Sequence, residues 1–181
     1  MRRITAHLFH SLDGIVSSPH VWQFDAFDSG CGEAMGAALA TTDAMILGRT
    51  AYEEWADYWP THGDADPFGA FVNPLRKYVA SRTLTEPLAW HNSTLLQGEL
   101  TDAVRALRDT DGGDITVVGI SVIRQLFLAG LIDALTLTTH PVVAGSGTRL
   151  WEAADEPLRL TLLDSRITEK GNAVLTYGPR R

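Results

Sequence analysis

Three short segments carry residues whose types and spacing suit the binding of phosphate groups. They are Gly48-Arg49-Thr50 within "ILGRTAYEEW", Ser81-Arg82-Thr83 within "VASRTL", and Gly119-Ile120-Ser121-Val122 within "VVGISVIRQL". Glycine lets a ligand approach the backbone closely, and an arginine guanidinium offers a fork of donors that matches phosphate oxygens. The three segments together predict a site for one anion-rich ligand.

Each segment also has an ordinary structural interpretation. Arg49 is also explained as a solvated turn residue or as the partner of Glu53, and Arg82 as a surface arginine in a turn. Ser121 suits the N-cap of a helix, a role that needs no ligand. The third segment is not a G-x-G-x-x-G motif, and no acidic residue of a Rossmann fingerprint is evident. The hypothesis of a ligand site therefore depends on the three segments acting together.

The elements around these segments predict a common location for them. Each segment comes at the end of an apolar run that reads as a strand, and ligands of open α/β sheets bind at the carboxyl ends of strands. These strands are predicted over residues 43–47, 77–81 and 114–119, with helices over 49–58 and 121–130. An arginine flanked by hydroxyls at a strand end suits a 2′-phosphate better than a free ribose, so the pattern favours NADP over NAD.

The remaining sequence completes an α/β pattern. Strands and helices alternate first, and strand signals alone follow from residue 133, which indicates a mainly parallel sheet with an antiparallel C-terminal edge, flanked by helices. We expect one domain over residues 1–181. The further predicted elements are a strand over 3–9, a helix over 30–40, a short helix before residue 77, the strand "STLLQ", a helix over 101–108, and the strands "ALTLTTHPVV", "LRLTLLDSRI" and "AVLTYG".

Composition narrows the class of protein. The chain has 181 residues, 45% of them hydrophobic, and a formal net charge of −7, without the basic stretch that a nucleic-acid partner requires. No apolar run is long enough to span a membrane, and the first residues do not read as a secretion signal, so we expect a cytoplasmic protein. Cys31 is the only cysteine, and the histidines show no ligand spacing with acids, so no metal site is expected.

The order of the motifs resembles the dihydrofolate-reductase-like superfamily. The segments "SLDG", "ILGRTAYEEW", "VASRTL" and "VVGISVIRQLFLAGLIDALTLTTHPVVAGSGTRLW" carry the resemblance, which covers nearly the whole chain and is most specific over residues 117–151. Within the superfamily the sequence is most similar to the reductase domain of the bifunctional riboflavin-biosynthesis deaminase–reductase. The resemblance implies an NADPH-binding reductase fold with a central, mostly parallel sheet, often as a homodimer.

The resemblance also implies roles for individual residues. Departures from the family pattern are the Gly-Ile-Ser at 119–121, where many relatives carry more glycine, and the absence of the deaminase half with its zinc-binding cysteines. The implied positions are Gly48, Arg49 and Thr50 at the cofactor phosphates, Ser81 and Arg82 near the 2′-phosphate, Gly119, Ile120, Ser121 and Val122 at the pyrophosphate, and Gly14 and Ile15 near the nicotinamide.

Four further residues are candidates for contact with the substrate. Asp13 and Glu33 are candidate acids, although Asp13-Gly14 is also a common turn pair and Glu33 also reads as a solvated helix carboxylate. His140 is a candidate donor or hydrogen-bond partner for a polar heterocycle, or a structural histidine. Trp22 is a candidate for an aromatic wall, together with Phe24, Phe27 and Trp59, and core packing is the alternative, which we prefer for Trp59.

These features predict an NADPH-dependent reductase that transfers hydride to a small, pterin- or pyrimidine-like heterocycle. The first alternative is a non-catalytic nucleotide-binding module with the same fold, because no proton donor is secure. A reductase with a flavin-type cofactor is a second alternative. We expect a homodimer, because the strand-rich C-terminal third offers sheet edges that a partner would cover.

Overall fold

The computed structural model describes residues 1–63, 65–152 and 156–180. The chain divides into two compact units, each built from two separate segments. The first unit comprises Met1–Ile4 and Thr42–Leu131, and the second comprises Thr5–Thr41 and the chain from Ile132 on. No helix in the described residues is long and apolar enough to cross a membrane.

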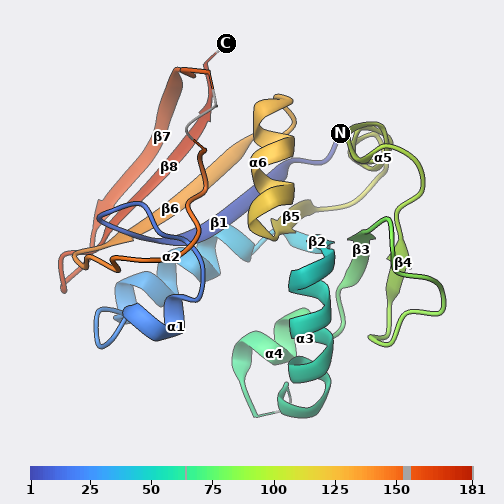
Figure 1. Ribbon diagram of the computed structural model, residues 1–181, viewed down its shortest axis with the longest axis horizontal. Coiled ribbons are helices and arrows are strands. Elements are labelled where there is room, and N and C mark those ends of the chain that lie inside the picture. The colour runs from blue at the N-terminus through green and yellow to red at the C-terminus, as the bar shows by residue number, and fades with distance from the viewer. Residues whose placement is uncertain (64, 153–155, 181) are drawn as a thin grey trace. The chain divides into compact units, whose positions relative to one another are not determined.

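The first unit is a parallel α/β arrangement. Its strands lie in the order β4-β3-β2-β5 and pair in parallel throughout (Figure 1). Strand β2 consists almost entirely of buried residues, as expected for a central parallel strand with both faces covered. The elements are β2 (Thr42–Gly48), α3 (Arg49–His62), α4 (Pro67–Val72), β3 (Arg76–Ala80), β4 (Ser93–Leu95), α5 (Leu100–Arg108), β5 (Asp114–Val118) and α6 (Ile120–Leu128).

An apolar cluster on the β2 and β3 strands fixes α3 and α4 in the first unit. Its buried members are Met45, Leu47, Tyr52, Val72, Val79 and Trp90. Trp59 packs against this cluster, so the core interpretation of Trp59 is confirmed. Lys77 of β3 is fully buried. Its Nζ donates to the carbonyls of Asn73 and Leu75 at 2.8 Å and lies 4.2 Å from the centroid of the Trp90 ring.

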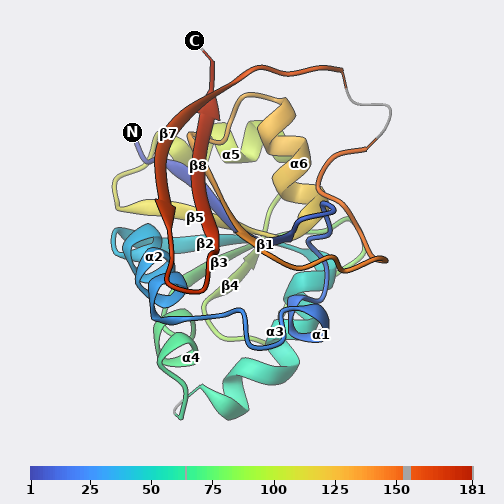
Figure 2. The ribbon, with the colours of Figure 1, turned by 90° about the vertical axis from the view of Figure 1, so that its left-hand side faces the viewer.

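The second unit contains the antiparallel part of the fold. Strand β1 pairs in parallel with β6, and β8 pairs antiparallel with both β6 and β7. Figure 2 shows β7 and β8 running side by side, in the dark red of the C-terminal end of the chain. The elements are β1 (Ile4–Ser11), α1 (Pro19–Trp22), α2 (Ser29–Leu39), β6 (Ala134–His140), β7 (Leu160–Ile167) and β8 (Ala173–Pro179).

The segment with α1 and α2 lies on one face of these strands. Phe27, just before α2, meets Phe9 of β1 edge-on with ring centroids 5.9 Å apart. Trp22 of α1 meets His140 of β6 in the same way at 5.9 Å. The short helix α1 was not predicted, because it spans one turn and its residues read as a polar and aromatic loop.

The predicted fold class is confirmed. Both units together contain parallel pairs on either side of β2 and between β1 and β6, and the antiparallel pairs are confined to the C-terminal strands. Most predicted elements are present with ends shifted by a few residues, as is usual for boundaries read from sequence. The expectation of a single domain stays a prediction.

Candidate functional site

The three arginine- and glycine-containing segments of the first unit come together at one sheet edge. Gly48 lies opposite Ala80 in the pairing of β2 with β3, and Leu47 lies opposite Val118 in the pairing of β2 with β5. Since all three strands are parallel, their carboxyl ends point the same way. The segments starting at Gly48, Ser81 and Gly119 are therefore neighbours, as the sequence predicted.

Two helices begin at this edge with free backbone donors. Helix α3 has Gly48 as its N-cap and α6 has Gly119, and neither N-cap makes a side-chain capping bond. The first N–H groups of a helix lack internal partners and carry partial positive charge. Two such starts side by side favour the binding of an anion.

The close approach of the two helix starts requires glycine. Gly119 has φ of +113°, and a Cβ placed on it would lie 3.3 Å from the backbone nitrogen of Gly48. A Cβ on Gly48 would lie 3.0 Å from Cγ2 of Val122. Val122 is buried, and its side chain packs against Gly48 while its backbone belongs to the first turn of α6.

The prediction that Ser121 is the N-cap of its helix is wrong. Helix α6 begins at Ile120, and Gly119 takes the N-cap position. The physical reason is the left-handed φ of Gly119, which turns the chain sharply after β5 and starts the helix two residues earlier. Ser121 is exposed in the first turn, and the helix start is left without a side-chain cap. At the other end, Gly130 has φ of +69° and lies just beyond the C-cap residue Ala129.

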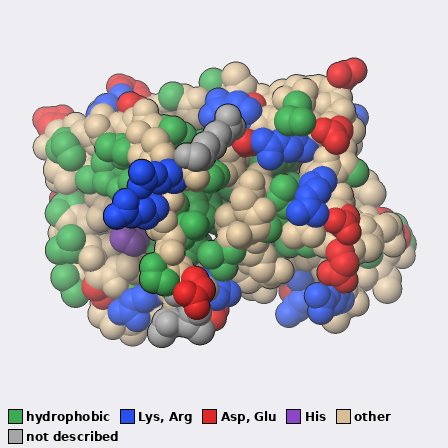
Figure 3. Space-filling model, turned by 90° about the horizontal axis from the view of Figure 1, so that it is seen from above, with side chains coloured by type: hydrophobic (Ala, Val, Ile, Leu, Met, Phe, Trp, Pro, Cys, Tyr) green, Lys and Arg blue, Asp and Glu red, His purple; other side chains and the backbone are tan. Residues whose placement is uncertain are grey.

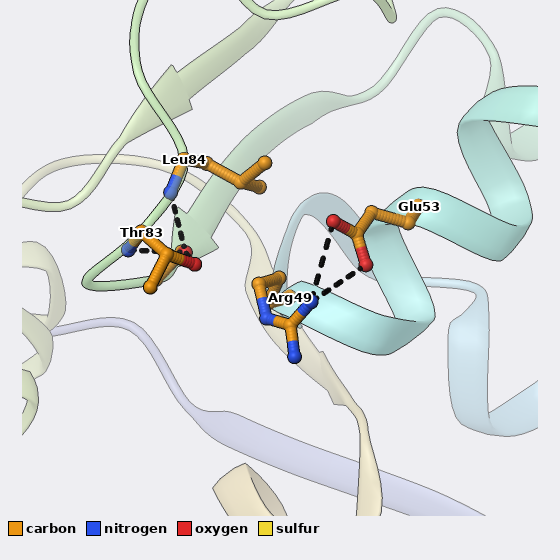
Figure 4. A network of polar contacts seen from close by, with 5 residues as sticks. Arg49, Glu53, Thr83 and Leu84 are labelled. Carbon is orange, nitrogen blue, oxygen red and sulfur yellow. Dashed lines mark hydrogen bonds and ion pairs between the residues drawn. The ribbon is translucent and has the colours of Figure 1, made fainter.

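Arg49 is the first residue of α3 and points into solvent beside this edge. Its Nη1 lies 3.1 Å from Oε2 of Glu53, an ion pair between two half-exposed side chains that is drawn in Figure 4. An exposed i,i+4 pair contributes only about 0.3–0.5 kcal/mol. A phosphate would therefore compete easily with Glu53 for the guanidinium, and Thr50 beside it is also exposed.

The loop after β3 presents Arg82 at its apex. The hydroxyl oxygen of Ser81 accepts hydrogen bonds from the backbone nitrogens of Thr83 at 3.1 Å and Leu84 at 3.0 Å, residues labelled in Figure 4. This turn holds Arg82 outward, where it is exposed. In the described part of the chain its side chain makes no ion pair, so its guanidinium is available to a ligand.

Gly14 and Ile15 lie in the second unit, in the turn after β1. The backbone nitrogen of Ile15 donates to the Ser11 hydroxyl at 2.9 Å, and Ile15 is buried. Gly14 has φ of +91° and lies under the side chain of Arg149, whose Nε donates to the Asp13 carbonyl at 3.2 Å. The turn is thus rigidly held by side chains that the sequence reading did not single out.

The Asp13 carboxylate acts as an anchor for the loop that follows β6. Its Oδ1 accepts from the Ser11 hydroxyl at 2.7 Å and from the Ala144 nitrogen at 2.9 Å, and its Oδ2 accepts from the Gly145 nitrogen at 2.9 Å. These bonds, that of Ser11 foremost, lower the pKa of Asp13 to about 2. A carboxyl group with this pKa is ionised at neutral pH, so the geometry favours the turn interpretation of Asp13 over an acid.

Glu33 also fits its alternative interpretation. It lies on α2 with an exposed side chain, 3.5 Å from Nη1 of Arg166 on β7. Arg166 donates in addition to the carbonyl of Gly30 at 2.9 Å, at the start of the same helix. Glu33 is therefore a solvated helix carboxylate that helps to hold the helix on the strand.

His140 is completely buried, with both ring nitrogens engaged. Its Nδ1 lies 2.6 Å from Oδ1 of Asn172, and its Nε2 lies 2.9 Å from Nε2 of Gln23. The Asn172 amide nitrogen donates to the carbonyl of Ala26, an atom that can only accept, so Oδ1 must face His140. Nδ1 of His140 therefore carries the proton, and Nε2 accepts from Gln23. Burial lowers the pKa of His140 and outweighs the hydrogen bond with Asn172 and the charge of Asp28, which raise it. The ring therefore stays neutral.

Trp22 packs on His140 rather than forming an open wall. It is buried, and its indole nitrogen donates to the carbonyl of Ser17 at 2.8 Å. Phe24 and Phe27 remain exposed on the same segment, with exposed fractions of 78% and 41%. Within this unit, the exposed aromatic surface is thus offered by Phe24 and Phe27.

The sequence reading missed the partners that fix this second set of residues. They are Ser11, Gln23, Ala144, Arg149 and Asn172. No spacing signal pointed to Gln23, Ala144, Arg149 and Asn172, because each acts through a contact with a residue distant in the sequence, whereas Ser11 bonds to Asp13 and Ile15 within one turn. Among the described residues, no group of three or more His, Cys, Asp or Glu side chains is placed to hold a metal ion.

Comparisons with known proteins relate this chain to one family and to one fold. The model of the RibD C-terminal domain family matches residues 2–174. The uncharacterized protein YyaP of Bacillus subtilis (strain 168) is 27% identical over 183 residues, which cover 97% of this chain and 94% of that protein.

Two solved structures show the same fold. A putative riboflavin biosynthesis protein from Shewanella sp. PV-4 has a TM-score of 0.74 at 21% identity and covers 99% of both chains. Dihydrofolate reductase from Enterococcus faecalis, solved in complex with NADP(H) and RAB-propyl, has a TM-score of 0.61 at 15% identity, and the match covers 99% of this chain and 97% of that one. The predicted resemblance to the dihydrofolate-reductase-like superfamily is confirmed.

Proposed function

The chain belongs to the RibD C-terminal domain family, and we propose that it is an NADPH-dependent reductase of a small, pterin- or pyrimidine-like heterocycle. The observation that carries the proposal is the pair of uncapped helix starts at Gly48 and Gly119, which meet at the carboxyl edge of the first unit's strands. Arg49 and Arg82 add two exposed guanidinium groups at the same edge.

These residues fit the phosphate groups of a dinucleotide. Backbone N–H groups at the starts of α3 and α6 would hold the pyrophosphate, and Arg49 would bind a phosphate oxygen in place of Glu53. Arg82, held outward by Ser81, would bind the 2′-phosphate that distinguishes NADPH from NADH. Gly14 and Ile15 would lie near the nicotinamide. When bound, NADPH supplies the hydride.

The residues of the chain are better placed to bind and orient ligands than to donate a proton. Asp13 is ionised, and both nitrogens of His140 are engaged within the fold. We infer that the proton for the reduced atom comes from solvent water held at the site rather than from either side chain. The non-catalytic nucleotide-binding module stays the alternative, and steady oxidation of NADPH with any pterin or pyrimidine would argue against it.

We also propose that two copies of the chain associate through the second unit. Strand β7 ends the strand order and is exposed along nearly its whole length. Leu162 and Leu163 are each 53% exposed and Ile167 is 68% exposed. Figure 3 shows hydrophobic side chains on the left-hand part of the surface, on the side where Figure 1 places β7 and β8. An exposed apolar edge strand is a template for pairing with another chain. Light scattering should show a dimer for the native chain and a monomer for Ile167→Asp.

The cytoplasmic location stays a prediction.

The first experiment is calorimetric titration of the purified protein with NADPH and NADH side by side. We expect micromolar binding of NADPH and much weaker binding of NADH. Binding of neither nucleotide would overturn the proposed cofactor, and equal binding of both would remove the 2′-phosphate contact. Absorbance of the purified protein in the visible range would instead indicate a flavin-type cofactor.

A further inference from the structure

Strand β4 stands at one end of the strand order, next to β3 alone (Figure 1). Two backbone bonds show which way its groups point. The Asn92 carbonyl accepts from the Lys77 nitrogen at 2.8 Å, and the Leu96 nitrogen donates to the Val79 carbonyl at 2.9 Å. Backbone groups of alternate residues point to the same side of a strand, so the N–H and C=O of Leu95 point away from β3. An outward N–H at a sheet edge is a template for pairing with another chain.

The Glu86 carboxylate covers this outward N–H. Its Oε1 accepts from the Leu95 nitrogen at 2.7 Å. The Leu95 carbonyl accepts from Nε2 of Gln97 at 3.4 Å, which is a weaker contact. Side chains therefore engage both outward backbone groups of Leu95, in the place that a further strand would take.

Two leucines fix the loop that carries Glu86. Leu84 and Leu88 lie two residues before and two residues after it, and both pack against the apolar cluster on β2 and β3. The loop is thus held on both sides of Glu86, while Glu86 itself is exposed. An exposed carboxylate adds nothing to the apolar packing, and its contact with the Leu95 nitrogen is the interaction that this position provides.

Strand β7, at the other end of the strand order, is exposed along nearly its whole length. Pairing of β7 with β7 of a second copy is isologous and closes at two copies. Pairing of β7 with β4 of a second copy is heterologous, because each copy then keeps one free edge, and such contacts build open-ended filaments. A covered β4 edge therefore confines strand pairing to β7.

We propose that Glu86 is a gate on the β4 edge, which closes this edge to the β7 strand of a second copy of the chain. The inference rests on the proposed association through β7 and concerns how that association is limited. Proteins protect sheet edges with charged side chains or with a covering loop, and Glu86 and its loop supply both. Removal of the carboxylate frees the Leu95 N–H for a carbonyl of an incoming strand.

Three variants separate the hydrogen bond from the charge. Glu86→Ala removes both, whereas Glu86→Gln removes the charge and keeps an amide oxygen that can accept from Leu95. Glu54→Ala is the matched control, because Glu54 is also exposed in the first unit and its loss changes the net charge by the same amount. This control is needed because a smaller net charge promotes association by itself. Thermal unfolding of the three variants checks that the fold is retained.

Hydrogen exchange at the Leu95 amide and light scattering over a range of protein concentrations test the gate. Exchange should be roughly tenfold faster in Glu86→Ala and nearly unchanged in Glu86→Gln and Glu54→Ala. Glu86→Ala alone should form assemblies larger than the native species, which grow with concentration. Unchanged exchange in Glu86→Ala, native size despite faster exchange, or equal assembly in Glu54→Ala or Glu86→Gln would each overturn the gate.

A double variant identifies the strand that pairs with β4. Ile167→Asp places a charge on β7, so its addition to Glu86→Ala should abolish the larger assemblies. Persistence of these assemblies would overturn β7 as the occupant of the β4 edge. A monomeric native protein would overturn the proposed dimer, whereas growth of Glu86→Ala that Ile167→Asp suppresses would still support the gate.

Discussion

Gly48 and Gly119 meet backbone to backbone, so closely that a Cβ added to Gly119 would lie 3.3 Å from the nitrogen of Gly48. The contact brings the starts of α3 and α6 together, and each start keeps its N–H groups free of side-chain caps. A pair of glycines at this place therefore serves two purposes. It allows the close packing of two strand–helix junctions, and in the proposed function it lets a phosphate approach both helix starts.

Replacement of Gly119 by alanine should weaken both the fold and the site. The φ of +113° disfavours any side chain, and the added methyl group would press on Gly48, at a cost of roughly 1–3 kcal/mol in the free energy of unfolding. We expect NADPH affinity to fall as well. Gly130→Ala is the matched control, because Gly130 also has positive φ, +69°, but nothing lies within 4 Å of its added Cβ. Denaturant unfolding and calorimetry on both variants should show loss of NADPH affinity only for Gly119→Ala.

Arg82→Ala should weaken NADPH binding far more than NADH binding. A hydrogen bond from a charged group to the 2′-phosphate contributes roughly 1.5–3 kcal/mol, and NADH lacks this phosphate. Arg76→Ala is the control, since Arg76 is an exposed arginine at the opposite end of the same strand. Calorimetry with both nucleotides measures the difference. An equal loss for the two nucleotides would show that Arg82 does not bind the 2′-phosphate.

Arg49→Glu should weaken NADPH and NADH alike. The substitution puts a negative charge at the start of α3, close to Glu53 and to the proposed phosphate position. Glu53→Gln tests the competing ion pair, because it frees the Arg49 guanidinium and should leave affinity equal or slightly higher. Unchanged affinity in Arg49→Glu, with the fold intact by circular dichroism, would remove Arg49 from the site.

Asp13 should control stability in acid rather than the pH dependence of turnover. Its pKa in the folded protein is about 2, below the ordinary value of 3.8, because the carboxylate accepts bonds from Ser11, Ala144 and Gly145. The stability that these bonds contribute is present above pH 4 and is lost as the pH falls toward 2. Urea unfolding between these pH values should show a smaller loss for Asp13→Asn than for the native protein.

The same variant tests whether Asp13 is an acid in catalysis. If Asp13 only anchors the loop after β6, Asp13→Asn should speed hydrogen exchange at the amides of Ala144 and Gly145, which donate to its carboxylate. The profile of turnover against pH should keep its shape near neutrality. Loss of an ionisation from that profile in Asp13→Asn would return Asp13 to the catalytic role.

Lys77→Met should destabilise the first unit. The buried ammonium group satisfies the carbonyls of Asn73 and Leu75, and leaving such carbonyls without a donor costs about 1–3 kcal/mol. Lys170→Met, at a half-exposed lysine, is the matched control and should change stability little. Chemical denaturation of the two variants gives the comparison.

Lys77 also predicts a dependence of stability on alkaline pH. Burial lowers its pKa to about 8 from the ordinary 10.5, so the unfolded chain binds more protons than the folded protein between these values. The contribution of Lys77 to the free energy of unfolding should therefore increase as the pH rises across this interval. Between pH 8 and 10.5, the free energy of unfolding of the native protein should rise relative to that of Lys77→Met, which lacks this ionisation.

The strand–helix junctions of the first unit were predictable because their signals are local. An apolar run followed by Gly48-Arg49 marks the end of a strand and the start of a helix within ten residues. The N-cap of α6 was predicted at Ser121 instead of Gly119, because capping preference favours serine. The backbone angle of Gly119 depends on its contact with Gly48, a residue of another strand, and no local preference reports it.

In the second unit, the side-chain partners of the candidate residues could not be predicted from the sequence. Asp13 was recognised as a turn residue or an acid, but its partners Ala144 and Gly145 lie more than 130 residues away. His140 was recognised as a candidate donor, and its engagement by Gln23 and Asn172 decides its protonation. Side-chain partners across such distances follow from strand pairing, which the sequence indicates only as a class of sheet.

The sequence by itself determined the alternation of strands and helices, the carboxyl-edge position of Arg49 and Arg82, and the family to which the chain belongs. Hydrophobic periodicity and turn residues act over a few positions, so they survive in the linear sequence. Tertiary structure alone decided that β2 lies between β3 and β5, that Gly48 meets Gly119, and that both ring nitrogens of His140 are engaged. These features depend on which buried surfaces pair across the chain, and that choice is made by packing and hydrogen bonding in three dimensions.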